Sequence, residues 1–240
     1  MTKSLMKDKN IKIRRANERG HAQHGWLDSY HTFSFADYYD PQYPEFRSLR
    51  VINEDRVEPA KGFGAHSHHD MEILTYIVEG SLKHQDSMGH ESVINAGDVQ
   101  KITAGTGIVH AEFNASATTR VHFLQIWILP KEKGLKPSYQ QFTLATPKTT
   151  PSLLLIGSST GGKNIVQFSQ EVDLYRGLLK KNEKIFHAFQ PSRAGWLQMI
   201  SGSLQLEGHA LKTGDGAAIE QSPIHLEALE ECEFLLFDLV

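Results

Sequence analysis

Residues 73–82 read Ile-Leu-Thr-Tyr-Ile-Val-Glu-Gly-Ser-Leu, and residues 93–98 read Val-Ile-Asn-Ala-Gly-Asp. The same features return in the same order, as Trp-Leu-Gln-Met-Ile-Ser-Gly-Ser-Leu at 196–204 and Ala-Leu-Lys-Thr-Gly-Asp at 210–215. Each copy holds a run of β-forming residues, a Gly-Ser-Leu turn, a second run and a Gly-Asp turn. Chance similarity between β-hairpins is the alternative, but here two turns match in order. The repeat therefore predicts two similar β domains in tandem.

Short segments rich in β-branched and aromatic residues fill much of the remaining chain, for example 121–128 and 233–240. Glycine, asparagine, aspartate or proline bounds most of them, and no long segment keeps the period of a helix. Many short strands with glycine turns favour a sandwich or a barrel. We therefore expect an all-β fold of two tandem antiparallel β-barrels of the jelly-roll type.

The stretch from 130 to 151 interrupts this pattern with four prolines and several lysines and threonines. Such a composition indicates a connection between domains, with a helical turn expected near 138–141. The expected organisation is an N-terminal barrel at 1–135, a linker at 136–150 and a C-terminal barrel at 151–240.

Composition limits the functional classes. The 240 residues carry 40% hydrophobic and 22% charged residues with a net charge of −3, so a full core is possible and a basic nucleic-acid surface is not expected. The single cysteine, Cys232, excludes an internal disulfide and is expected to be a structural thiol. Without a signal-like or membrane-spanning apolar run, the expectation is a cytoplasmic monomer that contacts neither membrane nor nucleic acid.

Two short motifs concentrate metal-binding chemistry. His66 and His68 are two residues apart, and so are His110 and Glu112. Alternate residues of a strand share a face, so each pair points one way, and a barrel can bring both pairs together. One His-x-His pair is weak evidence for a metal site, because such pairs are more often polar residues on the protein surface. Two pairs beside glycine-rich turns are much stronger evidence. Three imidazoles and a carboxylate suit Fe, Ni, Cu, Mn or Zn rather than Mg or Ca.

The same residues resemble the two sequence motifs of cupins. The first reads His66-x-His68-x₃-Glu72, and the second reads Gly105-x-Gly107-x₂-His110-x₃-Asn114. Within cupins the chain resembles the pirin family. The stretches that carry this resemblance are 19–35 (Arg-Gly-His-Ala-Gln-His-Gly-Trp-Leu-Asp-Ser-Tyr-His-Thr-Phe-Ser-Phe), 50–56, 62–66 and 104–110. The resemblance is strong over 12–140 and looser in the C-terminal half.

The resemblance implies two cupin barrels with one divalent transition metal, held in the first barrel. It implies the ligands His66, His68, His110 and Glu112, and it implies that Glu72 is not a ligand. Fe(II) is the favoured metal, with Ni, Cu, Mn, Co or Zn as alternatives. One departure from the family pattern is Lys101, which is expected to alter the outer surface or the rim of the pocket.

Two functional classes follow from the resemblance. Bacterial pirins resemble quercetin 2,3-dioxygenases, which cleave a flavonol with O₂; Glu112 is then the expected general base. Phe63, Met71 and Phe113 are candidates for the apolar pocket walls, with ordinary core residues as the alternative. Animal pirins resemble metal-dependent cofactors of transcription factors, so the second class is a non-enzymatic regulator that acts through a protein partner.

The remaining histidines and acids have simpler interpretations. Glu72 is either a fifth ligand or a hydrogen-bonded strand residue, and the second is favoured. His69 is expected to face away from the metal by strand parity. The three N-terminal histidines, His21, His24 and His31, are expected to hold their segment against the barrel.

The C-terminal copy also carries one echo of the metal motifs. His225 and Glu227 repeat the spacing of His110 and Glu112, but residues 189–193 carry no histidine pair. Two potential ligands rarely hold a transition metal tightly, so the second barrel is expected to be metal-free.

Overall fold

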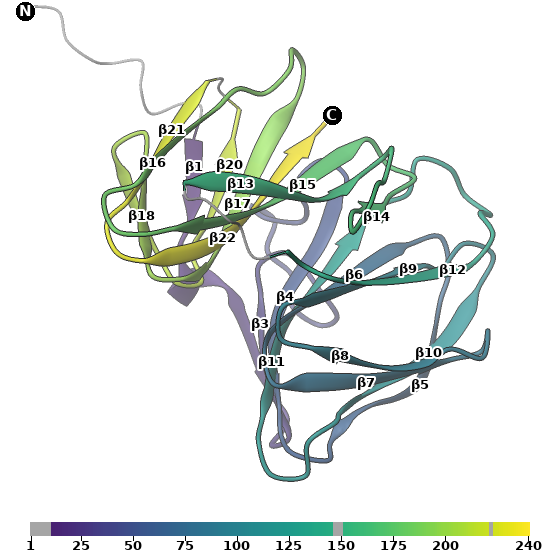
Figure 1. Ribbon diagram of the computed structural model, residues 1–240. Helices are drawn as coiled ribbons and strands as arrows, with labels where there is room; N and C mark the ends of the chain where they lie inside the picture. Colours follow the sequence, from purple (N-terminus) through teal and green to yellow (C-terminus); the bar gives the residue numbers. More distant parts are fainter. Residues whose placement is uncertain (1–10, 146–150, 221–222) are drawn as a thin grey trace, which may run out of the picture. The chain divides into compact units, whose positions relative to one another are not determined.

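The computed structural model describes residues 11–145, 151–220 and 223–240 (Figure 1). This part of the chain is built from strands and one short 3₁₀ helix, η1 (Ala16–Glu18), which confirms the all-β prediction. None of its helices has the length and hydrophobicity needed to cross a membrane. The chain forms two compact domains. The first comprises Arg19–Ala145 and Ser159–Gln170, and the second comprises described residues 11–18, 151–158, 171–220 and 223–240.

The first domain folds as two sheets that face each other, one above the other in Figure 1. The larger sheet has the strand order β12-β9-β6-β11-β4-β3-β2, and the smaller has the order β5-β10-β7-β8. The strands of these sheets are β2 (Gly20–Gln23), β3 (Leu27–His31), β4 (Leu49–Val57), β5 (Gly62–His68), β6 (Glu72–Glu79), β7 (Ser81–Asp86), β8 (Glu91–Asn95), β9 (Asp98–Thr103), β10 (Ile108–Asn114), β11 (Val121–Ile128) and β12 (Ser138–Thr143). The short strand β14 (Val166–Gln167) also lies among the residues of this domain.

The second domain repeats this architecture. Its larger sheet contains the strand order β1-β20-β17-β22-β15-β13, and its smaller sheet has the order β16-β21-β18-β19. The strands are β1 (Ile11–Arg14), β13 (Ser152–Ser158), β15 (Val172–Leu179), β16 (Lys184–His187), β17 (Ala194–Ser201), β18 (Ser203–Leu206), β19 (His209–Lys212), β20 (Gly216–Ile219), β21 (Ile224–Ala228) and β22 (Cys232–Leu239).

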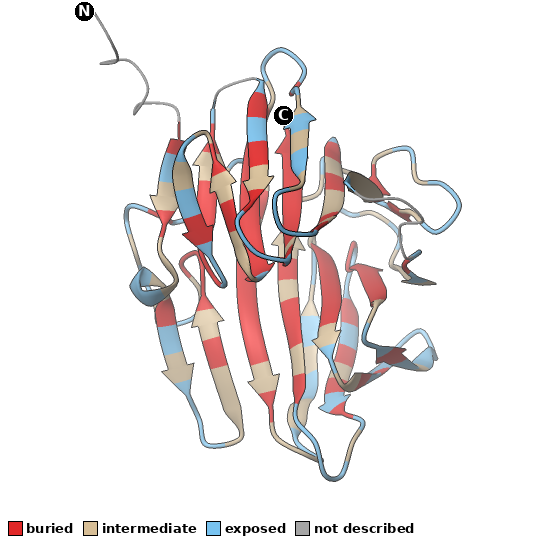
Figure 2. Cartoon of the chain, turned by 60° about the vertical axis from the view of Figure 1, so that its left-hand side comes forward, coloured by how far each residue is buried: buried red, intermediate tan, exposed pale blue. Residues whose placement is uncertain are grey.

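Alternation of side chains along the strands builds both cores. Buried and exposed residues form bands along many strands (Figure 2), because successive residues of a strand point to opposite faces. In the first domain the apolar core packs Phe123 against Ile77, Leu82 and Ile94. In the second domain the apolar core packs Leu197, Phe234 and Leu236 together.

The predicted repeat is present in the structure. Gly80 joins β6 to β7 and Gly202 joins β17 to β18, with φ angles of 80° and 72°. Glycine adopts this left-handed conformation without the steric cost of a side chain. The Gly-Asp turns also match, since the Asp98 carboxylate accepts the Asn95 backbone N–H and the Asp215 carboxylate accepts that of Lys212. Turn chemistry therefore fixes the same hairpins in both domains.

Two segments differ from the expected layout. Strand β1 pairs with β20, so the N-terminal strand completes the sheet of the second domain. The helical turn predicted near 138–141 is wrong, because Ser138–Thr143 is strand β12, paired with β9. Edge pairing with an available strand outweighs the local turn signal there. Residues 146–150 of the expected linker lie outside the described residues.

Candidate metal centre

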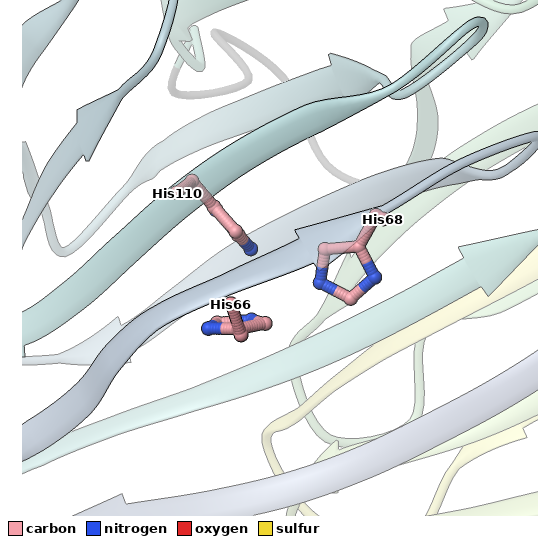
Figure 3. A group of neighbouring side chains, drawn as sticks. All are labelled: His66, His68 and His110. Carbon is pink, nitrogen blue, oxygen red and sulfur yellow. The ribbon is translucent and has the colours of Figure 1, made fainter.

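Three histidine side chains meet inside the first domain. His66 and His68 extend from β5 and His110 extends from β10, and their rings point toward one another (Figure 3). The ring centroids of His110 lie 4.4 Å from His66 and 5.0 Å from His68. One nitrogen from each of the three rings lies within 4.8 Å of the others. The three histidines of the two motifs therefore lie close together.

Strand register explains this convergence. His66 pairs directly with His110 in the β5–β10 ladder, and His68 lies two residues further along the same face. The β10 residues Ile108, His110, Glu112 and Asn114 are all buried. The two strands approach closely beside Gly62, where an added Cβ would lie 2.2 Å from the Glu112 carbonyl oxygen.

The triplet fits a transition metal. His110 is 1% exposed, yet neither of its ring nitrogens has a hydrogen-bond partner. Buried polar atoms are nearly always paired, so an orphaned imidazole indicates a missing partner. Burial, together with neighbouring histidines, lowers the pKa of His110 to about 3 and that of His68 to about 4. Both rings are therefore neutral at pH 7, which is the form that binds metals.

Glu112 sits beside the triplet and is fully buried. Its Oε1 accepts from Gln100 Nε2 at 2.9 Å and from the Thr75 hydroxyl at 3.4 Å, and its Oε2 accepts from Gln125 Nε2 at 2.8 Å. Glu112 is not a member of the close triplet, although its carboxylate lies within 4.8 Å of a His110 nitrogen. Amides from the facing sheet thus fix the carboxylate next to His110.

His84 is a site residue that the sequence reasoning missed. It is fully buried on β7, pairs with Glu112 across the β10–β7 ladder, and forms a second close donor group with His110 and Glu112. Its Nε2 lies 3.0 Å from Asp86 Oδ2, and its Nδ1 has no partner. The signal in the sequence was the spacing of His84 and Asp86, which are two residues apart like the members of the two metal-binding motifs.

A cavity of about 550 Å³ is lined by His66 and His68, two members of the triplet. This volume lies in the usual range for a small-molecule site. Of the expected walls, Phe63 lines the cavity. Met71 and Phe113 do not: Met71 packs against the core cluster around Ile73, and Phe113 is 41% exposed. The aromatic walls that the sequence did not reveal are Phe35, Tyr38 and Trp127.

The N-terminal histidines have a larger role than expected. His21, His24 and His31 line the same cavity as His66 and His68. His21 also holds its segment, because its ring stacks on Tyr30 with a centroid distance of 4.4 Å. These histidines therefore line the cavity in addition to the predicted role of holding their segment against the barrel.

Glu72 and Lys101 form a buried ion pair. Lys101 Nζ lies 2.7 Å from Glu72 Oε1, and the two side chains are 2% and 0% exposed. Glu72 also accepts from the Ser169 backbone N–H at 2.9 Å. The expectation that Lys101 alters the surface or the pocket rim is wrong, because its side chain is buried. The Glu72 carboxylate compensates the charge of the buried ammonium group. The hydrogen-bonded strand role of Glu72 is the one observed.

His69 behaves as strand parity predicted. Its side chain is 83% exposed, and its Nδ1 lies 3.6 Å from the Asp70 carboxylate. The neighbouring residue His68 faces the cavity instead. His69 is therefore a natural control position for substitutions in the triplet.

The depressed pKa values predict how the metal-free protein responds to acid. Histidine has a pKa of 6.5 in the unfolded chain, whereas His110 titrates at about 3 and His68 at about 4 in the fold. As the pH falls from 6.5 toward 4, the unfolded chain binds protons that the folded chain does not, so the free energy of unfolding decreases. Urea unfolding at pH 7 and pH 5 measures this loss. The loss of unfolding free energy between pH 7 and pH 5 should be smaller in His110→Leu than in the parent, and unchanged in His69→Leu. Equal pH dependence in both variants would contradict the low pKa of His110.

In the second domain, the residues that repeat the His-x-Glu spacing lie on the outer face of their strand. On β21 the buried residues are Ile224, Leu226 and Ala228, so His225 and Glu227 point outward. His225 Nδ1 lies 2.8 Å from Glu207 Oε1, and Glu227 pairs with Lys184 at 3.1 Å. The His-x-Glu spacing matches the first domain, but the register turns it away from the core.

Replacing His225 and Glu227 together with glutamine should leave about one metal per chain. Both side chains point out of the barrel and already have other partners. Elemental analysis of the purified protein measures the ratio. The matched control makes the same two changes at His110 and Glu112 on β10, and it should lose metal. A fall in bound metal in the β21 variant would show that the second domain contributes a site.

Cys232 is buried at the start of β22. Burial raises the pKa of its thiol to about 11, with a smaller contribution from Glu231. A thiol with such a pKa stays protonated near neutrality and is a poor nucleophile. The predicted structural role agrees with this environment.

Two antiparallel barrels in tandem, with a histidine-rich donor cluster in the first, define a bicupin. A family model described as pirin matches residues 12–128, and one described as quercetinase C-terminal cupin domain matches residues 155–239. A quercetin 2,3-dioxygenase of Escherichia coli (strain K12) is 46% identical over 95% of this chain and 98% of its own length. The chain belongs to the pirin family.

Solved structures agree with this assignment. The bacterial pirin YhhW from Escherichia coli in complex with nickel(II) superposes with a TM-score of 0.91 at 46% identity, covering 95% of this chain and 98% of that one. A quercetin 2,3-dioxygenase from Acinetobacter baumannii gives a TM-score of 0.79 at 21% identity, covering 96% of this chain and 86% of that one. The second likeness concerns the fold alone.

Proposed function

We propose that this protein is a metal-dependent dioxygenase that cleaves flavonols such as quercetin with O₂. The observation that carries the proposal is the buried, unpartnered His110 beside His66 and His68 at the end of an aromatic-walled cavity. The proposed ligands of one divalent metal are these three histidines and Glu112. The name of the E. coli relative and the nickel(II) in the E. coli pirin structure support both parts.

When bound, a divalent transition metal supplies Lewis acidity and an open position for chemistry with O₂. The protein supplies the rest. Phe63 and Trp127 form apolar walls that hold a planar aromatic substrate and exclude water. Glu112 accepts the proton of the substrate hydroxyl at one carboxylate oxygen, so it acts as the general base. The amides of Gln100 and Gln125 keep that carboxylate oriented before and after the proton arrives.

Fe(II) is the proposed native metal, since imidazole and carboxylate ligands suit it, although the same donor set accepts nickel, copper, manganese, cobalt and zinc. We also propose a monomeric enzyme of the cytoplasm. The buried, unpaired Cys232 is compatible with a reducing compartment. Elemental analysis of protein from its native host identifies the metal.

The test is turnover of quercetin. Metal-free protein is loaded separately with Fe(II), Ni(II), Mn(II), Co(II) or Cu(II), and O₂ uptake is followed with quercetin present and absent. The proposal expects uptake that depends on both metal and flavonol and is accompanied by release of carbon monoxide. If no metal supports turnover of any flavonol, the enzymatic proposal fails and the regulatory alternative gains.

A further inference from the structure

A row of polar side chains crosses the inner face of the larger sheet in the first domain. Each member is paired in register with the next: Gln100 with Thr75, Thr75 with Gln125, Gln125 with Asn53, and Asn53 with His31. The first three donate hydrogen bonds to the Glu112 carboxylate, as described above. The last two, Asn53 and His31, lie on β4 and β3.

The far end of this row is buried but unsatisfied. Asn53 Oδ1 and His31 Nδ1 have no hydrogen-bond partner, although the residues are only 3% and 6% exposed. Asp55, two residues along β4 on the same face, is 3% exposed, and its Oδ1 also has no partner. Its carboxyl accepts a hydrogen bond from the Ser29 side chain. All three unpartnered atoms belong to residues that line the cavity of His66 and His68.

Buried polar atoms without partners are costly, so three of them in one cavity wall indicate a site for a polar ligand group. The amide oxygen of Asn53 accepts hydrogen bonds and cannot donate them. The unpartnered carboxyl oxygen of Asp55 is a second acceptor position in the same wall. The ligand group that fits such a wall is a hydroxyl donor.

We infer that Asn53, Asp55 and His31 form a hydroxyl-recognition subsite, which binds the phenolic hydroxyls of an aromatic ring held away from the metal. The inference rests on the proposed function and deepens it, because it assigns specificity for a polyhydroxylated substrate to named residues. Phe35 stands edge-on to Trp127 and to His31, so an aromatic wall meets the polar row here. A ring that stacks on this wall presents its hydroxyls to the unpartnered atoms.

The test measures binding rather than turnover. The full chain is loaded with Ni(II), and affinities are measured without O₂ for quercetin and for 3-hydroxyflavone, which keeps the 3-hydroxyl and lacks the hydroxyls on both outer rings. The parent protein should bind quercetin tighter by about 10-fold or more, since the analogue leaves buried acceptors unpaired. In Asn53→Leu and in Asp55→Leu, the affinity for quercetin should fall toward that for 3-hydroxyflavone, with metal content unchanged.

Asn95→Leu is the matched control, because Asn95 is exposed on β8 and lies outside the cavity lining. It should keep the full preference for quercetin. Equal affinity of the parent for both flavonols overturns the inference while leaving the enzymatic proposal intact, and this comparison needs no variant to fold. A preference that survives in both Asn53→Leu and Asp55→Leu also overturns it. If neither flavonol binds, the subsite and the proposed function fail together.

Discussion

Replacing His110 with alanine is expected to remove nearly all bound metal. His110 lies between His66 and His68 on one side and Glu112 on the other, so its loss leaves ligands that no longer converge. The fall in affinity should exceed the roughly 10–100-fold that follows loss of a hydrogen-bonding partner of a ligand. Competition with a chelator of known affinity measures it.

The control for this change is His69→Ala. His69 neighbours the triplet in sequence but is 83% exposed and points away from the cavity. It should retain the metal affinity of the parent. Both variants should remain folded, since His110 belongs to a barrel with its own apolar core. Metal binding by His110→Ala at the parent affinity would remove this histidine from the proposed ligands.

Replacing Glu112 with glutamine is expected to abolish most turnover of quercetin while leaving the protein folded. Glutamine keeps the shape of the side chain and one oxygen, but its amide does not accept a proton at neutral pH. General-base catalysis contributes about 10²–10⁴-fold, so a loss of that order is expected in kcat. Steady-state O₂ uptake with saturating quercetin measures it.

The substitution also removes one negative charge from the metal centre, so activity must be expressed per bound metal. Gln125→Glu is unsuitable as a control because it adds a charge beside Glu112. His84→Gln is more informative, because His84 belongs to the same donor group as His110 and Glu112 and the substitution leaves Glu112 unchanged. Turnover per metal that stays near the parent value in Glu112→Gln would make Glu112 a ligand without a role as base.

Periodicity and turn chemistry explain why much of the molecule was predictable. The Gly-Ser-Leu and Gly-Asp turns need a glycine in the left-handed conformation, so these short sequences predict hairpins. Gly80 and Gly202 adopt this conformation in the first and second domain. The period of two along a strand placed His66 and His68 on one face. Those local rules suffice for the fold class and the triplet.

Long-range pairing explains what was missed. No local signal shows that β1 joins the second domain through β20, because the pairing partner is some 200 residues away. His225 and Glu227 have the same spacing as His110 and Glu112, yet their register turns them outward. Spacing predicts that two residues share a face, but only the packed sheet decides which face is inside.

The polar wall of the cavity was hidden for the same reason. Asn53 and Asp55 read as ordinary polar positions of a strand, and the closed first domain turns them inward against the cavity. His84 and Asp86 lie on the inner face of β7 in the same way. Spacing alone therefore does not reveal polar residues that face a cavity, because only the packed sheet shows which face is inside.

The central claim is one metal site in the first domain, and anomalous diffraction from metal-loaded crystals tests it most directly. Data collected at the absorption edge of the bound metal should show one peak per chain, about 2 Å from nitrogens of His66, His68 and His110 and from a Glu112 oxygen. A peak beside His225 in the second domain, or one bound by His84 without His66 and His68, would contradict it.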